Sequence, residues 1–131
     1  MINEDAFTKN CTGDCVTGDT ILFSEAVFSG SFKKPVYRGD RRIVAKIVKD
    51  SYGAGKQQHT FTLEILDSDG FDPLKPGTKT TRKGRNVYRN GTSRLPWEDE
   101  SLRNAAADEK HARGDAARAE RAARKEEEGR F

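Results

Sequence analysis

Three segments of the chain carry the hydrophobic pattern of β-strands. Residues 20–28 and 41–49 are rich in β-branched and aromatic side chains, which are stiff at χ1 and disfavour a helix. Residues 60–66 alternate strictly, with Phe61, Leu63 and Ile65 on one side and two threonines and a glutamate on the other. This alternation predicts a strand that has one buried face and one solvated face.

Turn-forming residues separate these segments. Glycine and proline mark loops at residues 30–40, 53–55 and 67–77, and residues 78–88 form a further β-prone segment that is interrupted at Gly84. We expect a hairpin or a bulged strand there, ending at Asn90 and Gly91. Four or five short strands joined by glycine-rich turns predict a mostly β fold over residues 19–95: a small antiparallel SH3-like or OB-like barrel, or a curled sheet.

The two ends of the chain differ from this β domain. Residues 1–18 are polar and rich in turn signals, and we expect them to be a flexible N-terminal segment. Pro96 precedes three acidic residues and an alanine-rich stretch, which predicts one long, charged α-helix over residues 96–129. Trp97 and Leu102 are the expected docking points of this helix on the β domain.

The charge of the chain is distributed unevenly. Residues 1–97 hold 16 lysines and arginines against 11 aspartates and glutamates, whereas residues 98–131 hold 8 against 10. The β domain is therefore basic, which indicates an acidic partner such as nucleic acid. No apolar run reaches the length of a membrane span and no signal pattern opens the chain, so we expect a cytoplasmic protein without a membrane partner.

The basic residues concentrate in one stretch, residues 73–97, which contains no acidic residue. Like charges repel one another, so an uninterrupted basic run favours a bound anion. We expect a basic hairpin that contacts a nucleic-acid backbone, with tyrosine available for base stacking. The candidate residues are Lys75, Lys79, Arg82, Lys83, Arg85, Asn86, Tyr88, Arg89 and Arg94, together with Lys56 and His59.

Other basic residues would extend this surface if the loops gather at one end of the domain. They are Lys33, Lys34, Arg41 and Arg42. The simpler alternative is a solvated hairpin whose cations face water. The sequence does not distinguish DNA from RNA.

Metal binding and catalysis are not expected from the sequence. Cys11 and Cys15 have a spacing that zinc ligands use, and His59 and His111 would complete a set, but there is no second cysteine pair. The carboxylates of the β domain are scattered, and no nucleophile and base stand together. We therefore expect a binding protein rather than an enzyme, with neither a metal nor a cofactor.

An alternative function places the activity in the helix. A compact β domain with a charged helix resembles, in format, the small phage- and plasmid-encoded inhibitors of host defence systems. In this interpretation the chain binds and blocks an acidic protein partner through its β domain and its alanine-lined helix. The helix residues concerned are Ala112, Ala116, Ala119 and Ala123.

Overall fold

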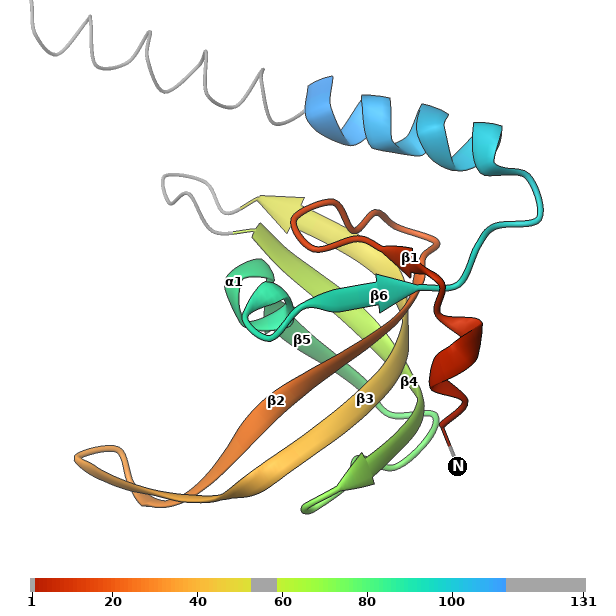
Figure 1. Cartoon of the computed structure of the whole chain (residues 1–131). Helices are drawn as coiled ribbons and strands as arrows, with labels where there is room; N and C mark the ends of the chain where they lie inside the picture. Colours follow the sequence, from red (N-terminus) through yellow and green to blue (C-terminus); the bar gives the residue numbers. More distant parts are fainter. Residues whose placement is uncertain (1, 53–58, 113–131) are drawn as a thin grey trace, which may run out of the picture.

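The computed structural model describes residues 2–52 and 59–112. The strands are β1 (Lys9–Asn10), β2 (Thr20–Ser31), β3 (Lys34–Tyr52), β4 (His59–Gly70), β5 (Lys79–Lys83) and β6 (Thr92–Arg94). A short 3-10 helix, η1 (Glu4–Ala6), precedes them, and the helix α1 (Gly84–Tyr88) lies between β5 and β6. Residues 100–112 form a C-terminal helix, drawn in blue in Figure 1.

All six strands belong to one antiparallel sheet with the order β1-β6-β2-β3-β4-β5. The sheet curls strongly (Figure 1). The expectation of a mostly β, antiparallel fold is confirmed. The sheet is not closed into a barrel, so the specific SH3-like or OB-like form is not what the structure shows.

The core lies inside the curl of the sheet. Alternate residues of the three central strands point into it, and none of these side chains is more than 2% exposed: Ile21, Phe23, Ile43, Ala45, Ile47, Phe61, Leu63 and Ile65. The predicted alternation in residues 60–66 is confirmed. Removal of these side chains from water supplies the main driving force for folding, at about 25 cal/mol per Å² of apolar surface.

The hairpin of β2 and β3 is longer than the sequence predicted. Residues 30–40, expected as a loop, pair as strand up to the register Ser31↔Lys34, with a bulge between Val27 and Phe28. Gly39 has a φ of 151°, and a Cβ at this position would come within 3.0 Å of the Phe71 Cβ. The glycines of this segment therefore bend a continuous hairpin instead of ending its strands.

The basic stretch does not form the expected hairpin. Strand β5 pairs with β4, whereas β6 pairs with β1 and β2 on the other side of the sheet. The chain crosses between them through α1, which begins at the buried Gly84. A Cβ at this glycine would stand 3.5 Å from the backbone oxygen of His59, an ordinary van der Waals distance, so the start of α1 lies directly against β4.

The segment before β2 and the described part of the C-terminal helix both pack on the sheet. We expected residues 1–18 to be flexible, but β1 extends the sheet and Cys11, Cys15 and Val16 are buried. The C-terminal helix begins at residue 100 rather than at Pro96, and residues 113–131 lie outside the described part of the chain. In the residues that the structure describes, no helix is long and apolar enough to cross a membrane.

Candidate functional site

A basic groove of about 350 Å³ lies on the surface between β2, β3 and α1. Its lining residues are Glu25, Ala26, Phe28, Arg41, Arg82, Asn86, Arg89 and Asn90. Of the residues that the sequence singled out, the structure brings together Arg82, Asn86 and Arg89, and it adds Arg41 from β3. With three arginines and one glutamate, the lining has an excess of two positive charges.

Glu25 organises the arginines of the groove. Arg41 donates to it from Nε at 2.8 Å, and Arg82 donates from Nε at 2.9 Å and from Nη2 at 3.1 Å. Burial opposes ionisation of Glu25, but the hydrogen bonds from Arg82 and Arg41 outweigh it and lower its pKa. The carboxylate therefore stays charged and holds both guanidinium groups in fixed positions.

Arg82 has little capacity left for a ligand. Besides Glu25, its Nη1 donates to the Thr80 hydroxyl and to the Thr81 carbonyl, each at 2.9 Å. A guanidinium has five N–H donors, and four contacts are already made within the protein. Arg82 therefore shapes the groove, whereas the exposed Arg89 has its charge directed to solvent.

Four further basic residues of the predicted set are exposed. They are Lys75, Lys79, Lys83 and Arg85. Lys79 and Lys83 lie on β5, which is an edge strand. Charged side chains on an edge strand also prevent pairing with other chains, so their exposure alone does not establish a ligand site.

Three predicted residues are used inside the fold instead. Arg94 is 7% exposed and donates to Glu100 from both terminal nitrogens, at 3.0 and 2.9 Å. The Tyr88 hydroxyl accepts a hydrogen bond from the Cys15 amide at 3.1 Å, and the ring of Tyr88 packs edge-on against a core phenylalanine. His59 lies 3.6 Å from Asp50. None of the three is available to stack on a base or to contact phosphate.

The other predicted residues divide between exposed and undescribed positions. Ala112 is exposed on the C-terminal helix. Lys56, Ala116, Ala119 and Ala123 lie outside the described residues. Arg42, which we expected to extend the basic surface, is paired with Asp69 and Glu4.

A buried polar cluster centred on Asp19 was not predicted from the sequence. This side chain is fully buried and accepts four hydrogen bonds. The donors are Trp97 Nε1 at 2.7 Å, Arg103 Nε and Nη2 at 2.9 Å each, and the Val16 amide at 3.0 Å. We call Asp19, Trp97 and Arg103 the Asp19 clamp.

The clamp fixes which face of the C-terminal helix meets the sheet. Arg103, Ala107 and Lys110 are buried, at the spacing of one helical face. Lys110 Nζ donates to the Cys15 carbonyl at 2.5 Å, and burial lowers the pKa of this lysine. The expected docking by Trp97 agrees with the structure, but Leu102 is 63% exposed and does not dock.

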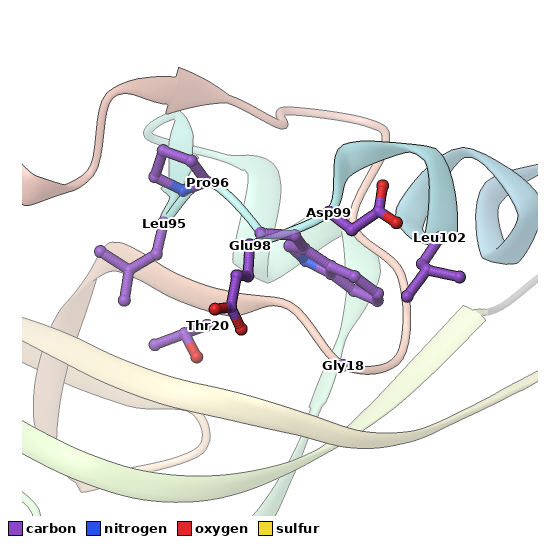
Figure 2. A pocket seen from close by; sticks show the side chains of 8 residues that line it. Gly18, Thr20, Leu95, Pro96, Glu98, Asp99 and Leu102 are labelled. Carbon is purple, nitrogen blue, oxygen red and sulfur yellow. The ribbon is translucent and has the colours of Figure 1, made fainter.

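An open hollow of about 430 Å³ lies beside the clamp (Figure 2). Figure 2 shows Leu95, Pro96 and Leu102 around it, with Glu98 and Asp99 at its side. The Trp97 ring packs on Gly18, where a Cβ would come within 2.9 Å of the ring. The hollow follows from the course of the chain between β6 and the C-terminal helix.

The two cysteines do not form a metal site with the described side chains. Cys11 Sγ and Cys15 Sγ lie 3.2 Å apart and both side chains are buried. The hydrogen bond with Cys11, together with burial, raises the pKa of the Cys15 thiol, which disfavours the thiolate that zinc requires. Within residues 2–52 and 59–112, no three histidine, cysteine or carboxylate side chains gather as metal ligands would.

The fold and the groove thus define a single-sheet β domain with a basic surface, and comparison with known proteins places it in a family. Residues 11–97 match the family described as "Domain of unknown function (DUF7699)". The chain belongs to this family. The matched region contains every strand of the sheet except β1, together with the basic groove and two of the three clamp residues.

One curated relative extends the similarity beyond the family match. The chain is 44% identical over 126 residues to "Zinc finger CCCH domain-containing protein 62" of Oryza sativa subsp. japonica, a match that covers 91% of this chain and 18% of the rice protein. The chain has two cysteines, fewer than a Cys₃His zinc finger requires. No solved structure matches the chain.

Proposed function

We propose that this chain is a non-enzymatic nucleic-acid-binding module that contacts the phosphate backbone through the basic groove and the exposed cations beside it. The observation that carries the proposal is the excess positive charge of the groove, in which Glu25 positions Arg41 and Arg82. In protein–DNA complexes, arginine, lysine and asparagine side chains contact the phosphate backbone, and these contacts supply much of the affinity.

The rice relative supports the same class of ligand. Its name records a zinc finger of the CCCH type, and zinc fingers are recurrent nucleic-acid-binding modules. The matched segment is a small part of that protein, and this chain lacks the cysteines for such a finger. We infer that the domain supplies a backbone-binding surface of its own and does not depend on zinc.

The contacts divide between two kinds of residue. Lys83, Arg85 and Arg89 are exposed and provide the charges that meet phosphate. Arg82 and Arg41 are anchored on Glu25 and set the shape of the groove. A surface of this kind gives binding with limited sequence specificity, because phosphate contacts carry no base information.

The test is binding to fluorescent single- and double-stranded DNA and RNA over about 50 to about 300 mM salt. On duplex DNA, each phosphate that is neutralised contributes about 0.9 to the slope of log K against log salt. The triple variant Lys83→Gln/Arg85→Gln/Arg89→Gln is expected to bind more weakly at low salt and to reduce the slope by about 2 to 3. Arg82 is left in place because its loss would disturb the groove itself.

A matched control makes the same change of charge elsewhere. Lys9, Lys46 and Lys49 are exposed and line no part of the groove, so their replacement by glutamine is expected to leave the slope nearly unchanged. Equal weakening by both triple variants would mean that net charge, and not the groove, determines binding. Absence of binding by the intact protein at low salt would refute the proposal and direct the search to protein partners.

A further inference from the structure

The end of the β2–β3 hairpin projects beyond the rest of the sheet (Figure 1). We call residues 28–38 the hairpin arm. In the pairings of the described strands, β6 accompanies β2 only along Ile21, Leu22 and Phe23, and β4 joins β3 only from Arg41 onward. The arm is therefore a two-stranded ribbon with no strand on either side, which on its own is marginally stable in water.

The arm exposes its large apolar side chains. Phe32, at the turn, is 103% exposed, and Phe28, Tyr37 and Val36 are 56%, 56% and 50% exposed. A hairpin turn in water is ordinarily polar, because exposed aromatic surface gains nothing from the solvent. A contiguous group of exposed aromatic residues instead marks a surface that binds something.

The aromatic residues share a face and border a hollow. Phe28 and Tyr37 are direct partners across the two strands, with ring centroids 5.9 Å apart in an edge-on arrangement. Gly30 and Pro35 form the next pair on the same face, since side chains alternate along a strand. A hollow of about 390 Å³ lies there, lined by residues 28–32 and Pro35.

The charge of the arm is of one sign. Lys33, Lys34 and Arg38 are exposed, and residues 28–38 contain no aspartate or glutamate. Phe28 lines both the hollow of the arm and the basic groove. The arm and the groove are therefore neighbouring parts of one surface, which presents aromatic rings at one end and cations along its length.

We propose that the hairpin arm binds single-stranded nucleic acid by stacking unpaired bases on Phe32 and in the hollow beside Phe28, while Lys33 and Lys34 contact the adjacent phosphates. This inference rests on the proposed function, which assigns the phosphate backbone to the groove. Exposed rings interspersed with cations are the features that sequence-tolerant single-strand binding uses, because every base has a π-face. The strand that lies on the arm continues past Phe28 into the basic groove.

The charge pattern favours this ligand over an apolar protein surface. A protein partner that covered Phe32 and Phe28 would also have to neutralise three neighbouring cations. A single strand supplies an aromatic base and a phosphate in every nucleotide, so it satisfies both features of the arm at once. A second copy of this chain carries the same positive charge on its arm and would be repelled.

The first experiment compares two probes on the intact protein and on Phe32→Ala. One probe is a short oligothymidylate; the other is an abasic oligonucleotide of the same length, which offers phosphates without bases. Phe32→Ala is expected to weaken binding of the oligothymidylate by roughly 5- to 150-fold, the range that one stacked base contributes, and to leave the abasic probe unaffected. Leu102→Ala removes another exposed apolar side chain, far from the arm, and should change neither.

The outcomes separate the inference from the function on which it rests. A DNA duplex is measured beside the two probes. If the intact protein binds neither the probes nor the duplex, the proposed function itself fails; if it binds only the duplex, the proposed function stands and the single-strand inference is overturned. If the intact protein binds and Phe32→Ala binds oligothymidylate equally well, only the stacking inference is overturned. An equal loss of affinity for duplex and single strand would also overturn it, since that would indicate a wedge between base pairs.

Two further variants sharpen the assignment. Phe32→Trp retains a stacking surface and should restore binding of oligothymidylate to at least the level of the intact protein. Lys33→Gln/Lys34→Gln should weaken both probes alike and lower the salt slope by up to about 1.4, the contribution of two phosphates on a single strand. If the double variant lost more affinity for one probe than for the other, the two lysines would not act by contacting phosphate.

Discussion

The Asp19 clamp, which joins the C-terminal helix to the start of β2, and the hairpin arm at the far end of β2 differ in which side chains they bury. In the clamp a carboxylate is fully buried and every lone-pair direction is occupied by a donor. In the arm a phenylalanine is completely exposed and the cations beside it face water. The clamp thus buries charged side chains in the interior of the protein, whereas the arm exposes aromatic side chains to solvent.

This difference in burial distinguishes residues that stabilise the fold from residues that are candidates for binding. A buried charge that is fully hydrogen-bonded contributes to the fold, and removing one partner leaves the other uncompensated. An exposed aromatic residue contributes little to stability, because it is already in contact with solvent in the folded state. We therefore expect substitutions in the clamp to change stability and substitutions in the arm to change binding.

The largest effect is expected at the clamp itself. Asp19→Asn keeps the shape of the side chain but removes the buried counter-charge of the Arg103 guanidinium and leaves only the partly exposed Asp14 near it. We expect a loss of about 3 to 5 kcal/mol in the free energy of unfolding, measured by urea denaturation. The contact of the C-terminal helix with the sheet should weaken at the same time.

Asp14→Asn is the matched control for this change. The Asp14 carboxylate stands 3.6 Å from Arg103 and its side chain is 48% exposed. Partly exposed ion pairs of this kind contribute at most about 1 kcal/mol, so the control should be close to the intact protein. Equal losses at the two positions would show that burial of Asp19 is not what stabilises the clamp.

The second prediction concerns Glu25, which affects both the folding stability of the protein and the net charge of the groove. Glu25→Gln removes the anchor of Arg41 and Arg82, and we expect a loss of about 1 to 3 kcal/mol in the free energy of unfolding. The groove simultaneously gains one net positive charge, so affinity for nucleic acid should rise at low salt. Glu98→Gln makes the same change in net charge outside the groove and should alter neither quantity. A variant that was less stable and also bound more weakly would show that the shape of the groove matters more than its charge.

Much of the sheet follows from the hydrophobic pattern. The alternation of Phe61, Leu63 and Ile65 identified a strand with one buried face, and the structure has that strand with those residues inside. The hairpin arm was missed because its glycines and Pro35 are the residues of loops. Within a long hairpin the same residues provide a bulge and a bend, and pairing with the opposite strand determines which role they take.

The candidate site was predictable only in part, for a physical reason. A basic run in the sequence shows how many cations are present, but the positions of carboxylates far along the chain decide which cations are neutralised. Glu25 lies 57 residues from Arg82 and pairs with it. The clamp is of the same kind, since Asp19 and Arg103 are 84 residues apart. No local pattern records such pairs.

The third prediction uses the pair of Arg94 and Glu100 at the end of β6. The hydrogen bond from Arg94 lowers the pKa of Glu100 from 4.5 to about 2. Because the folded-state pKa lies below the unfolded value, the stabilisation is present above pH 4.5 and is lost as the pH falls toward 2. Glu100→Gln should therefore be less stable than the intact protein at neutral pH, with the difference shrinking between pH 4.5 and 2 in urea denaturation. A difference that stayed constant over this range would show that the charge of Glu100 does not stabilise the pair.

The smallest effect on stability is expected in the hairpin arm. A result there would most directly contradict the distinction between the clamp and the arm. Phe32→Ala should change the free energy of unfolding by no more than about 0.5 kcal/mol, because a fully exposed side chain has no packing to lose. Truncation of a phenylalanine buried in a core, by contrast, lowers the free energy of unfolding by about 3 to 5 kcal/mol. Phe61 is fully buried, so Phe61→Ala should show this loss in the same assay. A substantial destabilisation by Phe32→Ala would mean that the turn packs against the protein in solution. The aromatic surface of the arm would then be part of the fold, and the distinction between the clamp as structure and the arm as interface would no longer hold.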